Sequence, residues 1–563
     1  MNFKKYFIVC SLIGFSFQIN AQEFSWGGSF GGNGEDVIKE AHIDSDGNVY
    51  TTGYFTDTTN FDINGSFELT SNGFYDAFVQ KTDSEGNFLW AKNFGSEMFE
   101  HGGAITTDDV GNVYITGNYE GTVNFDPEGS GFEITSAGAQ DIFILKLDSN
   151  GDFVWAKSVG GADFEEALSI AYSPIGQVIL SGFFYEPIDL DPGVDEFILT
   201  SEGLSDTFIL RLDENGDFIS AQQYGGTGID LAIDMTVNAV GDLFITGYFT
   251  NAADMNPDAV EEHILTATGG GFAGYVLHLN NAGEFVKAGL THGGETFNNG
   301  IAVDEMDNIY VSGYFTGTVN FNHDPNGTPI NYTSATQYNG FVMKVDSFGN
   351  VAWAKHLECN DFLMGYDVAV TGEGNVVSAG YFTGTADFDP SSDEFSLTHQ
   401  SSNATDAYLS ILDAEGNFIN AYQFGGVNFM DANSVGVDSQ NNIYTAAHFE
   451  TSVDLNPLPD DELSVEAVDL RDNYIVKLQN GSLTNPDVTS SQLSVYPNPA
   501  NDKIYLEGLS QESGKKYHVT DVKGRLLFSG RLGHDLSIDV SILKAGLYYI
   551  KVAELKPVKL LKR

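Results

Sequence analysis

The chain has 563 residues, of which 42% are hydrophobic, and its formal net charge is −54. This hydrophobic content excludes a globally disordered chain. The charge makes nucleic acid and anionic membrane surfaces poor partners, because both are themselves negative. Residues 23–480 carry 11 Lys and Arg against 71 Asp and Glu, whereas residues 493–563 carry 12 against 7. The acidic body favours solubility outside the cell, and it would attract cations or cationic partners.

Residues 1–22 have the pattern of a signal peptide. Lys4 and Lys5 precede the apolar run Tyr6–Phe17, and Ala21 is a suitable cleavage position. The run is too short to span a bilayer, and we expect no transmembrane segment elsewhere. After cleavage Cys359 is the only cysteine of the mature chain, so an internal disulfide is excluded.

A repeat follows, marked by the glycine of a "GYF"-like triplet. A regular period of this size is typical of stacked or radial repeats. The marker falls at Gly53, Gly117, Gly182, Gly247, Gly313 and Gly380, with Ala447 in the seventh place.

Each repeat predicts four short strands. In the first repeat, a strand ends at the turn Asp44–Asn48, and Val49–Phe55 forms the second strand. A longer loop containing Asn60–Asp62 follows, and then the strands Asp76–Asp83 and Phe88–Gly95. Alternating and aromatic residues favour strands, and glycine in the turns supplies the conformation that a tight hairpin needs. Seven such units predict an all-β fold, a seven-bladed β-propeller over residues 23–480.

The two ends of the pattern complete each other. The seventh repeat stops after its third strand, Asn473–Asn480, and Glu23–Gly32 resembles a fourth strand without the other three. We therefore expect the N-terminal strand to close the ring as the outermost strand of the last blade. The repeated pieces "GNVYxTGYF", "DAFxxKxDxxGNFxWA" and "FGG" resemble the SBBP-type bacterial β-propeller repeat. This resemblance implies a propeller fold and an extracellular setting, without a defined reaction.

After a linker at residues 481–492, residues 493–563 predict a small β-sandwich. "YPNPA", "DVKGR", "AGLYYIKV" and the basic end of the chain resemble the type A sorting domain of type IX secretion. The resemblance implies that the type IX secretion machinery is a partner and that this domain is removed after export. The passenger is then released or attached to surface polysaccharide outside the outer membrane. The matching positions are Pro497, Asn498, Pro499, Asp521, Gly524, Gly546 and Tyr548.

Few residues form a motif that indicates catalysis or metal binding. "GGSFG" places Ser29 in a G-x-S-x-G motif, but this motif requires a strand, a turn and a helix, and Ser29 lies in the predicted closing strand. The turn residues Asp44, Asp46 and Asn48 resemble a calcium loop, whereas equivalent turns lack the acidic set. Turn stabilisation by Asp and Asn explains all of these turns, and calcium is the alternative.

Two sets of loop carboxylates are expected to share the face on which propellers usually bind. They could hold cations or a cationic ligand, or they could cap strand ends. The aromatic residues of "GYF" are expected to fill the space between blades rather than to stack on sugars. The ligand-face candidates are Asp36, Asp163, Glu165, Asp230, Asp361 and Asp431, and the second set is Asp62, Asp126, Asp191, Asp254, Asp324 and Asp389.

The repeats differ little in length, which favours a binding or structural module at the cell surface over an asymmetric active site. We expect no enzymatic activity and no cofactor other than possible calcium. Two alternatives stay open. One is a hydrolase or lyase of extracellular polysaccharide that uses paired carboxylates on the acidic face. The other is a calcium-dependent adhesin. An extracellular glycan or protein is the expected ligand.

Overall fold

The computed structural model describes residues 22–563 except 257–260, 325, 401–403, 459–461, 482–493, 508–514, 522–524, 534 and 553–557. The signal peptide and the linker therefore lie almost entirely outside the described residues. Every regular element of the described residues is a β-strand, as expected for an all-β chain. The chain divides into a large unit, Phe24–Gln479, and a smaller unit that contains Asn480–Arg563.

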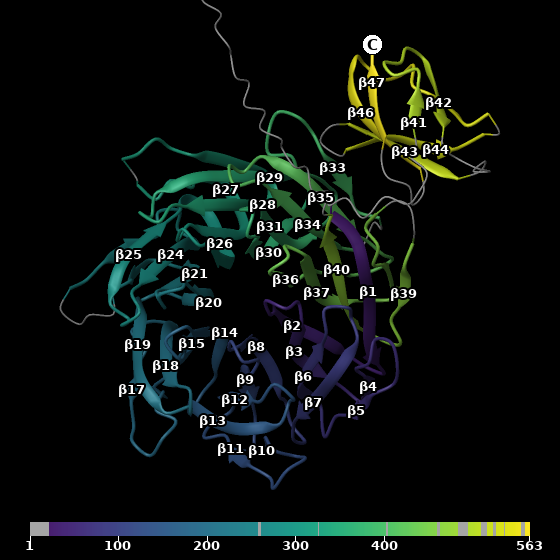
Figure 1. Ribbon diagram of the computed structural model, residues 1–563. Helices are drawn as coiled ribbons and strands as arrows, with labels where there is room; N and C mark the ends of the chain where they lie inside the picture. Colours follow the sequence, from purple (N-terminus) through teal and green to yellow (C-terminus); the bar gives the residue numbers. More distant parts are fainter. Residues whose placement is uncertain are drawn as a thin grey trace, which may run out of the picture. The chain divides into compact units, whose positions relative to one another are not determined.

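The large unit is built from antiparallel sheets arranged around a centre (Figure 1). The sheet of the first repeat has the order β2 (Asp36–Ile43), β3 (Val49–Phe55), β6 (Asp76–Thr82) and β7 (Phe88–Phe94). The next four repeats follow the same order, with β8 (His101–Thr107), β9 (Val113–Tyr119), β12 (Asp141–Leu147) and β13 (Phe153–Gly161); β14 (Glu165–Ser173), β15 (Gln177–Phe184), β18 (Asp206–Asp213) and β19 (Phe218–Gly226); β20 (Asp230–Val237), β21 (Leu243–Phe249), β24 (Ala273–Leu279) and β25 (Phe285–Leu290); and β26 (His292–Val303), β27 (Ile309–Asn320), β28 (Asn331–Val345) and β29 (Val351–Cys359).

The last two sheets include both ends of the large unit. One contains β30 (Leu363–Val370), β31 (Val376–Phe382), β34 (Asp406–Leu412) and β35 (Phe418–Phe424). The other has the order β36 (Ser434–Val437), β37 (Ile443–Phe449), β40 (Asp472–Asn480) and β1 (Gln22–Gly32). The N-terminal strand thus lies beside the last strand of the repeat region. Radial four-stranded antiparallel sheets of this kind define a β-propeller.

The loop between the second and third strands contains a short hairpin, which the sequence analysis treated as irregular. In the first repeat, β4 (Thr58–Asn60) pairs with β5 (Glu68–Thr70) and also with the end of β1, where Gly32 lies opposite Thr59. The other hairpins are β10 (Thr122–Asn124) with β11 (Glu133–Thr135), β16 (Ile188–Asp189) with β17 (Ile198–Leu199), β22 (Ala252–Asp254) with β23 (Ile264–Thr266), β32 (Thr385–Asp387) with β33 (Ser396–Thr398) and β38 (Ser452–Asp454) with β39 (Ser464–Glu466). The hairpins that begin with β4, β16, β22 and β32 each join the outer strand of the preceding sheet.

The repeated glycines are explained by close approach of other groups. A Cβ atom at Gly53 would lie 1.9 Å from the carbonyl oxygen of Val37, because a bulge brings the first strand close to the second. In the seventh repeat Ala447 is tolerated at this place, where the first strand, β36, is only four residues long. The chain therefore needs glycine wherever the first strand is complete.

Lysine and tryptophan link neighbouring sheets. Lys81 Nζ and Trp90 Nε1 donate to the carbonyl oxygen of Ser149 in the next repeat, at 3.4 and 3.3 Å. Lys477 Nζ and Trp26 Nε1 donate in the same way to the carbonyl oxygen of Ser84, at 2.9 and 3.0 Å. Trp26 belongs to β1 and Lys477 to β40. The two ends of the large unit together therefore reproduce the contact that the first repeat makes with the second.

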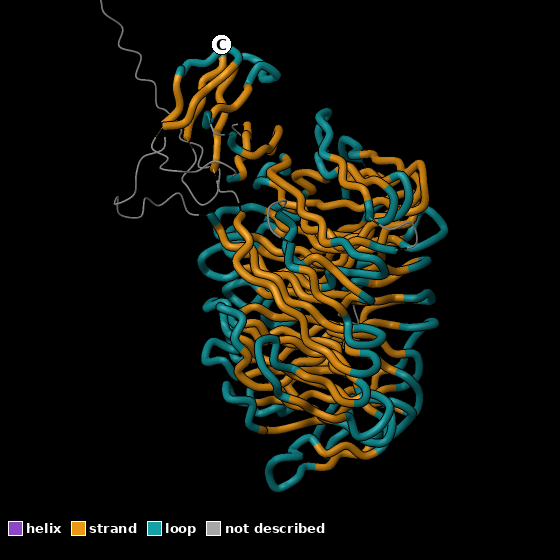
Figure 2. The backbone as a smooth tube through the Cα atoms, turned by 90° about the vertical axis from the view of Figure 1, so that its right-hand side faces the viewer, coloured by secondary structure: helices purple, strands orange, loops and turns teal. Residues whose placement is uncertain are grey.

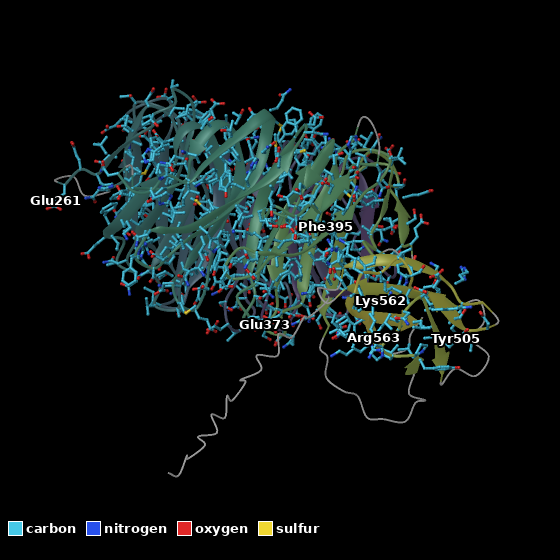
Figure 3. The ribbon with its side chains drawn as sticks, turned by 90° about the horizontal axis from the view of Figure 1, so that it is seen from above. Glu261, Glu373, Phe395, Tyr505, Lys562 and Arg563 are labelled. Atoms are coloured by element: carbon cyan, nitrogen blue, oxygen red, sulfur yellow. The ribbon has the colours of Figure 1, made fainter. Side chains whose placement is uncertain are left out.

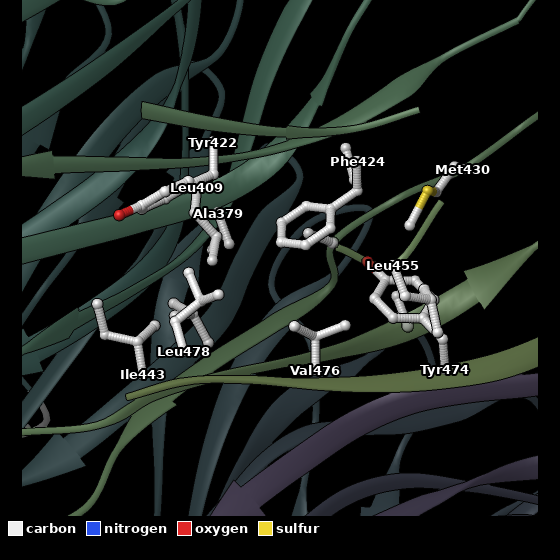
Figure 4. Close-up of a cluster of buried hydrophobic side chains, with 14 of the residues drawn as sticks. Ala379, Leu409, Tyr422, Phe424, Met430, Ile443, Leu455, Tyr474, Val476 and Leu478 are labelled. Carbon is white, nitrogen blue, oxygen red and sulfur yellow. The ribbon is translucent and has the colours of Figure 1, made fainter. Parts of the chain in front are cut away.

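The space between sheets is filled by buried apolar side chains. Between the last two sheets, Phe424, Met430, Leu455 and Val476 pack in one cluster with Tyr474 (Figure 4). Packing of this kind supplies most of the stability of a sheet protein, because each fully buried side chain contributes about 1.5–3 kcal/mol.

The small unit has two sheets around one core, as expected for a sandwich. Asn498 stands between Pro497 and Pro499, which cannot donate backbone hydrogen bonds. Its side chain replaces them, accepting from Leu561 N at 2.8 Å and donating to Lys559 O at 2.7 Å. The sheets are β41 (Ser494–Tyr496), β42 (Lys503–Glu507) and β45 (Ser537–Asp539), and β44 (Leu526–Arg531), β43 (Lys516–Asp521), β46 (Gly546–Val552) and β47 (Val558–Lys562).

The remaining positions of the sorting motif lie in turns and strands or at strand ends. Asp521 accepts hydrogen bonds from the backbone and the guanidinium of Arg525, both at 3.1 Å. Gly546 begins β46, and the Tyr548 hydroxyl donates to Lys544 O at 2.9 Å. Gly524 lies outside the described residues.

Candidate functional site

The connections of the large unit gather at two opposite ends of the strands (Figure 2). We call one end the turn face; it carries the tight turns after each first strand, such as Asp44–Asn48, and after each third strand, such as Asp83–Asn87. The other end is the loop face, where the chain enters each first and third strand. All of the ligand-face candidates were expected on this loop face.

Several of those candidates instead cap strand ends. Asp36, Glu165 and Asp230 are buried at the first residues of β2, β14 and β20. Each accepts a backbone hydrogen bond from the glycine four residues earlier, at 2.7, 2.6 and 2.9 Å respectively. Burial raises the pKa of Asp36 and Asp230 to about 7 and that of Glu165 to about 8. These side chains cap strand ends, which is one of the two roles expected for them, and contact with a ligand stays an untested prediction.

The other three candidates differ from one another. Asp163 is exposed and Asp361 is half-buried. Asp431 is buried, and its Oδ1 atom has no hydrogen-bond partner among the described residues.

The second set of carboxylates does not join the first set on one face, contrary to the prediction. These residues lie in or beside the short hairpins that fold back on the outer strands, and they cap those hairpins. Asp62 Oδ1, for example, accepts from Asn64 N at 3.0 Å, and Asp389 Oδ1 accepts from Ser391 N at 3.0 Å. The sequence analysis missed these hairpins because their three-residue strands could not be distinguished from the loop around them.

The proposed calcium turn is held by its own donors. Asp44 Oδ1 accepts from the backbone of Asp46 and Asn48 at 3.0 and 2.9 Å, and Asp44 Oδ2 accepts from the Asn48 side chain at 2.7 Å. The Tyr50 hydroxyl also donates to Asp44 Oδ2 at 3.3 Å. Among the described residues no group of three or more His, Cys, Asp or Glu is arranged to hold a metal ion. Calcium binding stays an untested prediction.

Aromatic side chains of the fourth and fifth repeats contact one another on the loop face. Tyr248 contacts Phe297, Phe297 stacks on Tyr314 with ring centroids 4.8 Å apart, and Tyr314 contacts Tyr338. Burial raises the pKa of Tyr314, and Tyr381 is among the hydroxyls that add to this shift. The tyrosines of "GYF" are half-buried. Only the phenylalanine of that triplet, such as Phe315, is fully buried.

A second group of aromatic side chains, in the sixth and seventh repeats, lies beside charged residues. Tyr366 and Tyr381 have ring centroids 5.5 Å apart, and Tyr381 contacts Phe429 at 6.0 Å. The Arg471 guanidinium lies over the Phe429 ring at 5.9 Å, a distance that allows a cation–π interaction. We call Tyr248, Tyr314, Tyr366, Tyr381 and Phe429 the aromatic series.

Arg471 organises the charges beside the aromatic series. Its Nε atom lies 3.1 Å from Glu450 Oε1, and its Nη1 atom lies 3.9 Å from Glu35 Oε1. Burial raises the pKa of Asp431 to about 7, although Arg471 opposes the shift. Burial, Arg471 and Lys39 together lower the pKa of His448 to about 3, so this imidazole is neutral at physiological pH. A neutral histidine, a cation and several carboxylates thus adjoin the aromatic rings.

The aromatic series breaks the symmetry of the repeats. The second repeat has a buried Asn118 in place of the "GYF" tyrosine, and the third has Phe183, which is 8% exposed. Half-buried rings with hydroxyl groups beside paired charges present flat apolar faces together with hydrogen-bond donors and acceptors. The sequence signal was the tyrosine of "GYF", but spacing alone did not show that loop aromatics such as Phe297 and Phe429 would meet it.

Comparisons with known proteins agree with the division of the chain. Residues 494–562 match the family described as Secretion system C-terminal sorting domain. An uncharacterized WD repeat-containing protein, L264, of Acanthamoeba polyphaga mimivirus is 24% identical over 426 residues, covering 64% of this chain and 30% of that protein. Regulatory protein FlaEY of Caulobacter vibrioides is 27% identical over 137 residues, covering 24% of this chain and 14% of that protein. The chain thus spans less than a third of the length of these relatives.

Solved structures with partial similarity include the Pan2 WD40 domain of Neurospora crassa, at 10% identity and a TM-score of 0.38, covering 79% of this chain and 90% of that chain. The extracellular domain of a putative hybrid two component system of B. thetaiotaomicron, BT4673, is 9% identical with a TM-score of 0.14, covering 96% of this chain and 99% of that chain. Because these TM-scores are low, the fold is assigned from the order of the strands in the sheets. The described residues contain no helix long and apolar enough to cross a membrane. The sorting domain implies export by type IX secretion and a place at the cell surface.

Proposed function

We propose that this protein is a seven-bladed propeller, closed by its N-terminal strand, that acts outside the cell as a binding module. Three observations support closure. β1 follows β40 in one sheet, and first strands pack against their neighbours, with β2 between β8 and β36. Ser434 Oγ also accepts from Ala41 N at 2.9 Å, which joins the last repeat to the first.

The aromatic series supports binding on the loop face. Strand geometry does not require adjoining half-buried tyrosines beside Arg471, and two other repeats fill the "GYF" tyrosine position with buried Asn118 and Phe183. Tyrosine combines a large apolar surface with a polar tip and loses little conformational entropy, which suits recognition. The ligand class that fits is an extracellular glycan or protein with an apolar face and polar edges.

An array of extracellular glycans and surface proteins tests this function with the full chain. The double variant Tyr314→Ala/Tyr381→Ala should lose at least tenfold in affinity for any ligand that the wild type binds. The control is Tyr185→Ala, because Tyr185 is 45% exposed and lies outside the aromatic series. The variant Tyr314→Phe/Tyr381→Phe keeps the aromatic rings, so it is the control for a loss of folding in the alanine variant. Equal binding by all four proteins would exclude the aromatic series as the site.

The two alternatives have no specific support among the described residues. A polysaccharide hydrolase would need an accessible carboxylate pair, whereas coupled pairs such as Asp206 with Asp230 are buried. A calcium-dependent adhesin should melt at a higher temperature with calcium than with a chelator.

A further inference from the structure

The turn face carries a run of exposed apolar side chains that the proposed binding function does not use. They occupy the third position of the turn between the first and second strands, in four consecutive repeats. Val110, Ile175, Val240 and Met306 are 75%, 50%, 58% and 71% exposed. We call these four residues the apolar arc.

Neighbouring turns of the apolar arc contact one another. The Asn238 side chain donates to Asp307 Oδ1 at 2.9 Å, which joins the turns of the fourth and fifth repeats. A Cβ atom at Gly241 would lie 3.5 Å from Ile175 Cγ1, which places the turns of the third and fourth repeats in contact. Phe348, which is 75% exposed, lies on the other turn of the fifth repeat at the same face. These contacts join the turns that carry Ile175, Val240 and Met306.

The turns themselves do not need apolar side chains at this position. The backbone N–H of Met306 donates to Asp304 Oδ1 at 2.8 Å, and that of Asp46 donates to Asp44 Oδ1 at 3.0 Å. The same turn is thus formed with a polar residue in the other three repeats, by Asp46, Glu373 and Gln440. Glu373 is exposed on its turn (Figure 3). Contiguous exposed apolar residues without a structural role mark an interaction surface.

The charges around the apolar arc indicate the charge that its partner carries. Exposed Asp109, Glu305 and Asp307 stand next to its members in the same turns. A second copy of this chain would bring a net charge of −54 against the same charge, which opposes association. We propose that the apolar arc binds a protein partner whose apolar patch is bordered by Lys and Arg. This surface lies at the opposite end of the strands from the aromatic series, so the two sites are independent.

Binding of designed peptides to the full chain tests the proposal by fluorescence anisotropy at about 0.15 M salt, where surface charges are already partly screened. The probe is an amphipathic helical peptide of Leu and Lys, compared with a peptide containing only the Lys charges and with a Leu and Glu peptide. The Leu and Lys peptide should bind the wild type at least tenfold more tightly than either comparison peptide. The variant Val110→Ser/Ile175→Ser/Val240→Ser/Met306→Ser should lose at least tenfold in affinity for it.

The matched control changes the same turn position in the other repeats, as Asp46→Ser/Glu373→Ser/Gln440→Ser, and should keep the affinity within about twofold. Equal affinity of the wild type and the apolar-arc variant would overturn the proposal. Binding of the Lys-only peptide as tightly as the Leu and Lys peptide would overturn it too. Sedimentation that shows a wild-type dimer, lost in the apolar-arc variant, would assign the surface to a second copy. Binding of the wild type but not the variant to neutral phosphatidylcholine vesicles would assign it to lipid. Unchanged melting temperatures would show that all variants fold.

Discussion

The glycines at the ends of the fourth strands show how single residues shape this fold. A Cβ atom at Gly95 would lie 2.1 Å from Asp76 Cγ, and one at Gly31 would lie 2.2 Å from Asp472 Cγ. Each of these aspartates is fully or nearly fully buried at the start of a third strand. The "FGG" motif of the sequence therefore leaves room for a buried carboxylate.

The variant Gly95→Ala should destabilise the protein by about 1–3 kcal/mol, because the added methyl group displaces Asp76 from its hydrogen bonds. Chemical denaturation followed by tryptophan fluorescence measures this difference. The control Gly372→Ala should change stability by less than about 0.5 kcal/mol. At Gly372 the only atom within 4 Å of an added Cβ is the side-chain atom Asn441 Oδ1, at 3.2 Å. Equal stabilities of the two variants would refute the role assigned to Gly95.

The type of a residue in the sequence predicted the role of its side chain less well than the spacing of residues predicted the repeats. Acidic residues near the start of each first strand were expected to cap strand ends or to meet a ligand, and Asp36 and Asp230 cap strand ends. The tyrosines of "GYF" were expected to fill the space between blades, and Tyr314 packs against Phe297 and Tyr338 from loop-face segments. In both cases the outcome depends on which residues from neighbouring repeats surround the side chain, and a pattern within one repeat does not contain that information.

At the scale of elements, the strands were predictable and the hairpins were not. The alternation in Val49–Phe55 is strong, and β3 has these bounds. The hairpin of β4 and β5 has three residues in each strand, too few for an alternating pattern, and its partner β1 comes from another repeat. Pairing between repeats fixed this element.

Neighbouring sheets bring carboxylates together where a third strand meets the first strand of the next repeat. Asp206 and Asp230 are both buried, and the Oδ1 atom of each has no partner among the described residues. Burial, followed by the charge of Asp206, raises the pKa of Asp230 from 3.8 to about 7. The folded state therefore binds a proton more tightly than the unfolded state, and the stability that this proton supplies is lost as the pH rises through about 7.

The melting temperature should therefore fall between pH 5 and pH 8. The variant Asp230→Asn should show a smaller fall, because its neutral amide needs no proton and can donate to Asp206. Calorimetry at the two pH values measures both effects. Asp46→Asn is the control, since Asp46 is exposed, and it should keep the full dependence. An Asp230→Asn variant with the wild-type pH dependence would contradict the account.

At the scale of the whole molecule, the sequence predicted two units of opposite charge, and the structure divides the chain near the same place. The repeat period was readable because each sheet uses the same turns, glycines and lysines. The two surfaces on opposite ends of the strands were not readable from that period. The apolar arc depends on departures from the repeat such as Met306, and the aromatic series depends on loop aromatics such as Phe429 that lie outside the repeated triplet.

The closed ring is the claim on which both surfaces depend, because each crosses several sheets whose relative positions the ring fixes. Its most direct test is the thermal melting of a chain lacking Glu23–Gly32, compared with the full chain and with Trp26→Phe. Trp26→Phe removes the hydrogen bond to Ser84 but keeps the strand. The deletion should lower the melting temperature sharply and abolish a single cooperative transition, whereas Trp26→Phe should melt cooperatively only a few degrees lower. A deletion variant that melts cooperatively at the temperature of the full chain would contradict the closed ring.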